Sequence, residues 1–284
     1  MAAIEEIILA GDKRGIAALR PYLPQDFCDV AARYILAQAG PTLIATGFYI
    51  AGAQAPETDG PPGALALGRA LTSLQRQVVY VSDHYTVPLL TALSAGEATI
   101  IDFPLADDTT SRQYATELLA TLHPTLLIAI ERCGMTATGA YLNMRGRDIT
   151  ATTARIDHLF LQHPHTLGIG DGGNEIGMGL LATHIPGVAS LPRQPTTTPT
   201  AHLVIASVAN WGAYGILAAL SRLVGRNLLP DVSAEMALIQ QAVDGGAVDG
   251  TTGAHEYTVD GFSLADNARV LAQLQQCLVG SIPS

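Results

Sequence analysis

The sequence contains a single lysine, Lys13, and three widely separated cysteines, Cys28, Cys133 and Cys277. The lysine lies in a charged N-terminal turn and not behind a strand, which excludes a Walker-type phosphate loop and disfavours a lysine Schiff base. Cysteines without a CxxC pair indicate a reducing compartment and exclude a thiolate zinc site. No histidine lies near Cys133, so we expect this residue to be small and buried.

Long runs of one residue type are also missing. The net charge is -10 and there is no basic stretch, which disfavours binding to DNA or RNA. No segment approaches the roughly 18 uninterrupted apolar residues of a membrane span, and the first residues do not resemble an export signal. We therefore expect a soluble cytoplasmic protein that binds neither nucleic acid nor membranes. Hydrophobic residues make up 48% of 284 positions, enough for a large core.

What the sequence does contain is an alternation of short apolar strands with helices. Strands are predicted at residues 41–48, 77–83, 98–104, 125–131, 165–170 and 202–207. Such alternation indicates an α/β fold with a mostly parallel, doubly wound sheet of about six strands and helices on both faces. Residues 1–38 have apolar positions at helical spacing, which predicts an N-terminal helical extension or lid before an α/β catalytic domain at residues 39–284.

The most unusual stretch is GDGGNEIGMG at residues 170–179, where five glycines surround Asp171, Asn174 and Glu175. It follows a predicted strand and is expected to open a short helix, whose first N–H groups could bind an anion or oxyanion. A tight turn with a helix cap is the structural alternative, although one glycine would suffice for it. The stretch includes a formal GxGxxG, but no acidic strand end follows at the required distance, which disfavours nucleotide binding.

Other polar residues also follow predicted strands, at the edge of the sheet where ligands of such folds bind. Glu57 and Asp59 come after the first strand, beside a Gly-Pro-Pro turn where Asp59 could equally cap a helix. The polar or aromatic residues after the fourth and sixth strands are Glu131, Arg132, Asn143, Arg145, Asn210 and Trp211. Structural alternatives are an ion pair for Arg132, a helix cap for Asn210 and simple packing for Trp211.

Four of these segments, in this order and spacing, resemble the D-glutamate cyclase family. They are ETDGPPGALALGRAL (57–71), IER followed by GxYxNxR (130–132 and 139–145), GDGGNEIGMG (170–179) and NWGAYG (210–215). The similarity covers roughly residues 40–265. The resemblance implies a hydro-lyase that cyclises D-glutamate to 5-oxo-D-proline with loss of water. The expected binding partner is therefore a small acidic substrate, D-glutamate or a similar molecule.

This reaction gives the candidate residues roles. Arg132 or Arg145 suits the α-carboxylate, because a guanidinium binds a carboxylate through two hydrogen bonds. The acid–base candidates are Asp59, Glu131, Asp171 and Glu175. Crowded carboxyl groups raise one another's pKa, so that a protonated acid can stand beside an ionised base at neutral pH. The remaining expected substrate contacts are Glu57, Asn143, Asn174, Asn210, Trp211 and the N–H groups of Gly172 and Gly173.

Several carboxylates around an anionic substrate would repel it unless arginines or a cation intervene. Mg²⁺ or Mn²⁺ held by Asp59, Asp171 and Glu175 would remove this repulsion, which makes metal ligation and acid–base catalysis alternative roles for the same residues. Two other functions fit the same residues. One is metal-dependent hydrolysis of a small carboxylate or phosphate compound, and the other is non-catalytic sensing of a small acidic metabolite.

Overall fold

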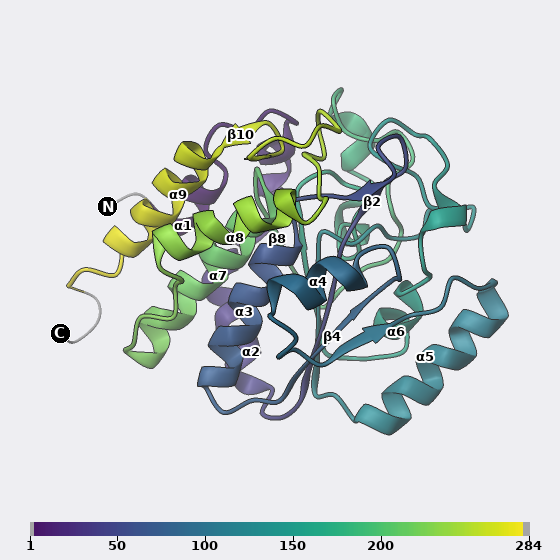
Figure 1. Cartoon of the computed structure of the whole chain (residues 1–284), viewed down its shortest axis with the longest axis horizontal. Helices are drawn as coiled ribbons and strands as arrows, with labels where there is room; N and C mark the ends of the chain where they lie inside the picture. Colours follow the sequence, from purple (N-terminus) through teal and green to yellow (C-terminus); the bar gives the residue numbers. More distant parts are fainter. Residues whose placement is uncertain (1–2, 281–284) are drawn as a thin grey trace.

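The computed structural model describes residues 3–280 and contains a six-stranded parallel sheet (Figure 1). The strand order is β5-β4-β1-β6-β7-β8. The strands are β1 (Thr42–Thr46), β4 (Val78–Ser82), β5 (Ile100–Asp102), β6 (Leu126–Ile130), β7 (Thr166–Gly170) and β8 (His202–Ile205). Each lies within a segment predicted as a strand, because runs of apolar residues suit strands covered on both faces. The predicted fold class is confirmed.

The strand order places a switch point at the centre of the sheet. From β1 the chain builds outward through β4 to β5, then returns to add β6 on the other side of β1. The connections therefore leave β1 and β6 toward opposite sides, which opens a crevice beyond their carboxyl ends. The residues that enter this crevice follow Thr46 and Ile130, the last residues of the two strands.

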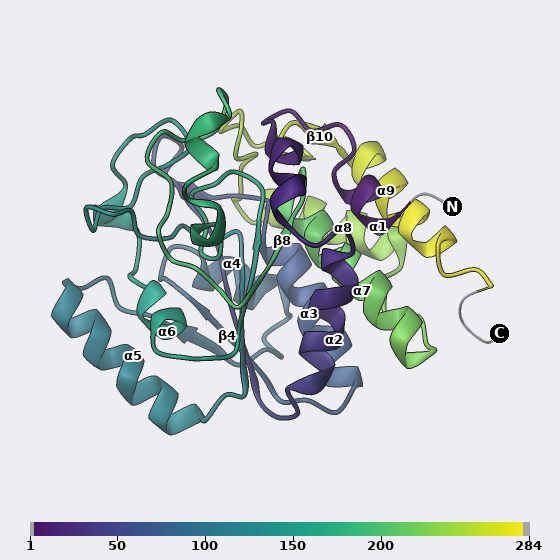
Figure 2. The ribbon, with the colours of Figure 1, turned by 180° about the vertical axis from the view of Figure 1, so that it is seen from behind.

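Helices cover both faces of the sheet, and side chains alternate between the two layers. Ile44 packs into the core formed with α2, α3 and α7, whereas Leu43 and Ala45 pack against α5 and α6 on the opposite face. Figures 1 and 2 show these two layers with the strands between them. The helices are α1 (Ile4–Ile8), α2 (Phe27–Ala37), α3 (Pro61–Ser73), α4 (Val87–Leu93), α5 (Asp108–Leu122), α6 (Asp157–Leu161), α7 (Ala209–Val224), α8 (Val232–Asp244) and α9 (Leu264–Gln276).

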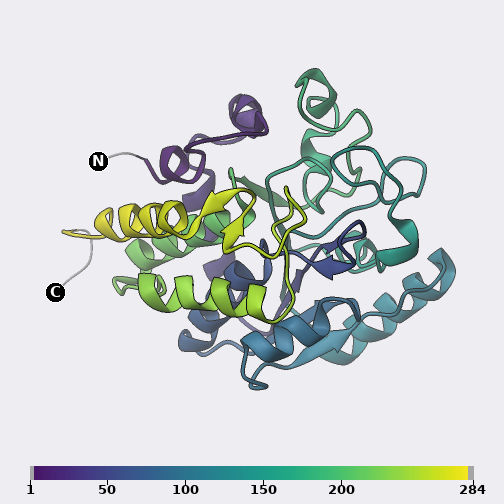
Figure 3. The ribbon, with the colours of Figure 1, turned by 45° about the horizontal axis from the view of Figure 1, so that its top comes forward.

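The N-terminal helices belong to the main core. Ile8 of α1 and Cys28 of α2 both pack beside Gly215 of α7, where a larger residue would collide with them. The turn between α1 and the 3₁₀ helix η1 (Ile16–Tyr22) lies beside the C-terminal hairpin of β9 (Thr258–Val259) and β10 (Phe262–Ser263) (Figure 3). Within residues 3–280, every helix is too short or too polar to cross a bilayer.

The stretch at residues 170–179 does not open a helix, and that prediction was wrong. After β7 the chain runs through bends and isolated bridges, and the first helical turn is the 3₁₀ helix η3 (Gly179–Leu181). Its backbone groups pair with other loops, as Ile176 N–H donates to Arg132 C=O at 2.8 Å and Gly177 N–H to Thr198 C=O at 2.9 Å. The helix-terminus anion site expected from the glycines is therefore not formed.

Short elements complete the loops at this end of the sheet. The segment after β1 contains the hairpin β2 (Tyr49–Ile50) and β3 (Ala55–Pro56). Two further 3₁₀ helices are η2 (Thr150–Thr152) and η4 (Ile185–Gly187).

Candidate active site

A cavity of about 360 Å³ opens at the carboxyl edge of the sheet. This volume lies within the range of about 300–1,000 Å³ usual for small-molecule sites. Its walls include Glu57 after β1, Glu131 after β6, Asn174 after β7 and Arg145 from the long loop that follows Glu131. Loops that are far apart in the sequence therefore meet at the switch point, as expected for ligand sites in open α/β sheets.

Six buried carboxyl groups gather beside the cavity. They are Glu57, Asp59, Glu131, Asp171, Glu175 and Asp260. Oxygens of Asp59, Asp171 and Asp260 lie within 4.8 Å of one another, and so do oxygens of Glu131, Asp171 and Glu175. Asp171 belongs to both groups. All four predicted acid–base residues are thus brought together, and Asp260 is an addition that the sequence did not suggest.

Glu131 occupies a strained position at the end of β6. Its φ of 44° is in the left-handed region, where residues other than glycine are uncommon. The following backbone turns to meet the 170–179 segment, and Cys133 forms an isolated antiparallel bridge with Glu175. On the other side, a Cβ atom at Gly60 would stand only 2.8 Å from the Glu131 Cβ. This packing holds the Glu131 carboxyl group against Glu175.

Asp59 and Asn210 cap each other's helices. The Asp59 carboxylate accepts hydrogen bonds from Ala209 N–H at 2.7 Å and Asn210 N–H at 2.8 Å, in the first turn of α7. In return, the Asn210 side-chain oxygen accepts from Gly60 N–H at 3.0 Å and Gly63 N–H at 2.8 Å, at the start of α3. Capping was the predicted alternative for both residues, but each was expected to cap the helix that begins beside it, and each caps the other helix instead. Asp59 nevertheless remains within the acidic group.

Burial and mutual repulsion shift the acidity of the cluster. Burial first, and the nearby Asp260 carboxylate second, raise the pKa of Asp59 to about 7. Burial followed by the charge of Asp171 raises the pKa of Glu131 well above its usual range, and burial does the same for Glu57. Protonated and ionised carboxyl groups can therefore coexist here at neutral pH.

As they do for Asp59, backbone N–H groups hold the carboxylate of Glu175. Burial raises its pKa, but its own N–H and those of Gly173 and Gly172 act in the opposite direction. The Gly173 N–H donates to Glu175 Oε2 at 2.7 Å. The oxyanion role predicted for the glycine N–H groups is therefore wrong for Gly172 and Gly173, since both serve this carboxylate.

Arg14 is a site residue that the sequence analysis missed. Its guanidinium makes ion pairs with Asp171 and, at 2.5 Å, with Asp260, while its side chain keeps 20% of its surface exposed and lines the cavity. Burial would lower the pKa of Arg14, but the carboxylates of Asp171 and Asp260 outweigh it and raise the pKa well above its ordinary value. The one available signal was the charged turn GDKRG at residues 11–15, flanked by glycines.

Arg132 does not reach the cavity, so its predicted role as a substrate clamp is wrong. Its side chain is 1% exposed and forms an ion pair with Asp83 at 2.6 Å. Two further guanidinium N–H groups, on Nη1 and Nη2, donate to Gly47 C=O and Ala154 C=O, both at 2.9 Å. The strand has ended at Ile130 and the backbone turns at Glu131, so that Glu131 lines the cavity whereas Arg132 is buried beside Asp83.

Trp211 is likewise a core residue, and its predicted substrate contact is wrong. The indole N–H donates to Asn267 Oδ1 at 2.7 Å, and the ring packs against Phe262 with centroids 4.7 Å apart. Simple packing, the structural alternative for this residue, explains its position.

Arg145 and Asn143 lie at the cavity as predicted. Arg145 is exposed and its Nη2 donates to Thr251 C=O at 3.3 Å, so its side chain reaches toward the opposite loop. The Asn143 side-chain oxygen accepts from the N–H groups of Arg145 and Arg147, both at 3.0 Å, which fixes the turn that presents these arginines. Of the two arginines predicted to bind the substrate carboxylate, Arg145 is thus the one at the cavity.

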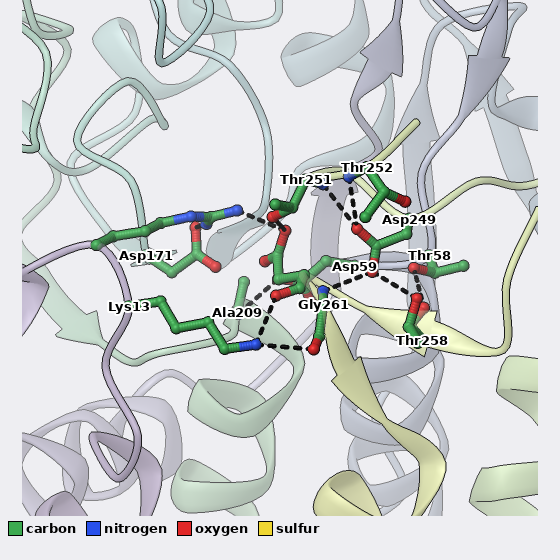
Figure 4. A network of polar contacts seen from close by, with 12 residues as sticks. Lys13, Thr58, Asp59, Asp171, Ala209, Asp249, Thr251, Thr252, Thr258 and Gly261 are labelled. Carbon is green, nitrogen blue, oxygen red and sulfur yellow. Dashed lines mark hydrogen bonds and ion pairs between the residues drawn. The ribbon is translucent and has the colours of Figure 1, made fainter. Parts of the chain in front are cut away.

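The loop that carries Asp260 is organised around Asp249 (Figure 4). The Asp249 carboxylate accepts from Thr251 N–H, Thr252 N–H, Gly261 N–H and the Thr258 hydroxyl at 2.6–2.9 Å. Lys13 joins this network from outside, because its ammonium donates to Gly261 C=O at 2.7 Å and lies 3.6 Å from the centre of the Phe262 ring. Neither residue was predicted from the sequence.

The comparisons with known proteins agree with this geometry. The fold is a doubly wound sheet with an acidic site at its switch point. The chain belongs to the D-glutamate cyclase-like, C-terminal family, whose model matches residues 4–275. Among curated proteins, the chain is similar to human mitochondrial D-glutamate cyclase, with 32% identity over 220 residues. The match covers 65% of this chain and 33% of that protein, so the chain spans about a third of the relative's length.

Proposed function

We propose that the protein cyclises D-glutamate to 5-oxo-D-proline with loss of water. The observation that carries the proposal is the meeting of two buried carboxyl groups with raised pKa values, Glu57 and Glu131, on the wall of a cavity that also presents Arg145. An intramolecular condensation needs a carboxylate clamp and groups that move protons. Both lie at this one cavity, in a chain of the cyclase-like family.

Substrate binding relies on three arginines that line the cavity, Arg145, Arg147 and Arg14. Arg145, with Arg147 next to it in the same turn, binds the α-carboxylate of D-glutamate, since a guanidinium matches a carboxylate in charge and shape. The side chain of the substrate then extends toward Arg14, which lines the same cavity. Holding amine and γ-carboxyl carbon in contact can contribute about 7–11 kcal/mol toward the barrier.

Glu57 is the group best placed to transfer protons. It lines the cavity, its Oε1 has no hydrogen-bond partner among residues 3–280, and it belongs to neither of the two tight carboxylate groups. As a carboxylate it takes a proton from the substrate ammonium, and the neutral amine then attacks the γ-carboxyl carbon. As an acid it returns the proton to the departing oxygen. Two protons leave nitrogen in total, and both depart with one γ-carboxyl oxygen as water.

The test is incubation of the purified protein with D- and L-glutamate, with and without EDTA, and measurement of 5-oxoproline. We expect conversion of the D enantiomer. Glu57→Gln removes the proton carrier and should lower kcat about 10²- to 10⁴-fold, while Glu256→Gln, an exposed change in a nearby loop, should leave it unaltered. Formation of 5-oxoproline from neither enantiomer in any metal condition would overturn the proposal. Glutamate binding without turnover would favour a sensor instead.

A further inference from the structure

We propose that Glu131, Asp171 and Glu175, together with the side-chain oxygen of Asn174, bind one hard divalent cation such as Mg²⁺ or Mn²⁺. This inference goes beyond the cyclase proposal and does not depend on it, because it concerns ligand geometry alone. It also changes the expected ligand set, since the sequence had suggested Asp59, Asp171 and Glu175.

The three carboxylates offer the ligands that hard cations prefer. One oxygen from each lies within 4.8 Å of the others, and all three side chains are at least nine-tenths buried. Mg²⁺ and Mn²⁺ favour oxygen ligands, and buried charges are ordinarily paired or coordinated to metals. Within the described part of the chain, Glu131 Oε2 accepts no hydrogen bond, so this oxygen is available to a cation.

Asn174 supplies an observation that is independent of the acidic cluster. Its amide nitrogen donates to Leu142 C=O at 3.2 Å, which fixes the orientation of the amide. Its oxygen is buried and has no hydrogen-bond partner among the described residues. A Cβ atom built on Gly172 would stand 3.1 Å from this oxygen and 2.6 Å from Glu175 Oε1. The missing side chain at Gly172 thus leaves the two oxygens near one another, in a space that the Met144 sulfur also borders, at 2.5 Å from the same Cβ position.

The other carboxylate group is already served by a cation of the protein. Asp59, Asp171 and Asp260 form that group, and the Arg14 guanidinium contacts both Asp171 and Asp260. A divalent ion placed there would lie against the guanidinium and be repelled. Arg14 therefore supplies a cation to Asp171 and Asp260, whereas Glu131 and Asn174 each keep a buried oxygen without a hydrogen-bond partner among the described residues.

Binding is measured by titrating the chelator-treated full chain with MnCl₂ and with MgCl₂ by isothermal calorimetry, and by the EPR signal of free Mn²⁺. We expect one ion per chain. Glu175→Gln and Glu131→Gln should each weaken Mn²⁺ affinity at least about tenfold, because even changes outside a ligand shell cost about 10- to 100-fold. Asp260→Asn is the matched control, as it removes an equally buried carboxyl group from the Arg14 side, and it should keep affinity within about threefold.

A variant expected to increase Mn²⁺ affinity shows that the losses of affinity in the other variants are not caused by misfolding. Asn174→Asp converts the amide oxygen into a charged ligand and should tighten Mn²⁺ binding. Circular dichroism confirms that each variant is folded. The inference is overturned if the parent chain binds no Mn²⁺ or Mg²⁺, or if Asp260→Asn abolishes binding while Glu175→Gln preserves it. Because no substrate is present, these outcomes are separate from the success or failure of the cyclase assay.

Discussion

Two arginines lie near the carboxyl edge of the sheet, and their surroundings differ. Arg132 is fully buried against one carboxylate, Asp83, and two backbone carbonyls. Arg14 is partly exposed, lines the cavity and faces a cluster in which carboxyl groups outnumber it. A charge matched by its partners is part of the fold, whereas an excess of one charge persists where a ligand or a proton completes the balance. Arg132 is therefore a structural residue, whereas Arg14 belongs to the candidate site.

We expect the largest effect from removal of the ion pair between Arg132 and Asp83. Arg132→Met leaves Asp83 buried without its partner, and we expect a loss of about 3–5 kcal/mol in the free energy of unfolding. Urea denaturation followed by circular dichroism measures it. The double variant Arg132→Met with Asp83→Leu removes both charges and should recover much of the loss. A single variant as stable as the parent chain would contradict the structural role.

The acidic cluster should give the protein an unusual pH dependence. Folded Asp59 keeps its proton up to about pH 7, whereas the unfolded chain loses it near pH 4. Between these values the folded state binds more protons, so stability falls as pH rises, by up to about 1.4 kcal/mol per pH unit for one group, and levels off above pH 7. The raised pKa values of Glu57, Glu131, Asp171 and Glu175 act in the same direction.

Urea denaturation between pH 4.5 and 8 in EDTA tests this expectation, because this range covers most of the window between about pH 4 and about pH 7 and extends into the expected plateau. Asp59→Asn, which cannot ionise, should flatten the slope. A parent chain whose stability increases from pH 5 to pH 7 would show that the cluster is not protonated in the folded state.

Arg14→Gln tests the other arginine, and we expect it to affect activity more than stability. The surrounding carboxyl groups can take up protons, so the variant should lose less stability than Arg132→Met. The γ-carboxylate of the substrate, however, loses a cation that lines the cavity, and we expect kcat/KM for D-glutamate to fall about 100-fold. Arg193→Gln, an exposed change whose side chain contacts Pro186 C=O, is the control. Equal stability losses at Arg14 and Arg132 would remove the distinction.

The smallest expected effect concerns a glycine beside Glu57. A methyl group at Gly250 would overlap the Glu57 carboxylate, so Gly250→Ala should displace this group and lower kcat about tenfold. Gly52 lines the same cavity, and a methyl group there meets no described atom within 4 Å. Gly52→Ala should therefore leave kcat unchanged. Similar kcat values for both variants would argue against Glu57 as the proton carrier.

The sheet was predictable because its signal is local. Each strand is a continuous apolar run such as Leu126–Ile130, and these runs alternate with helical segments. The helix expected at residues 170–179 failed because the backbone groups of this stretch pair with distant loops, including the one at residues 132–136. Local sequence carries no information on such partners.

The site residues that follow strands of the sheet were predictable, whereas Arg14 and Asp260 were not. Asp59, Glu131, Asp171 and Glu175 all follow strands, and parallel strands end at one edge. Arg14 and Asp260 meet across 246 positions of sequence, in a turn and a hairpin that follow no strand of the sheet. The substrate-binding role predicted for Arg132 was wrong for another reason. The residue type shows that a charge is present but not the direction in which the side chain points.

Lys13 offers a way to watch this site in solution. It is the single lysine of the chain, it is exposed, and its ammonium is hydrogen-bonded to the hairpin that carries Asp260. An acylating dye can consequently label only one ε-amino group, one residue away from Arg14. The rate of that labelling would report how often the Lys13 ammonium leaves its hydrogen bonds to the hairpin, with no engineered probe in the molecule.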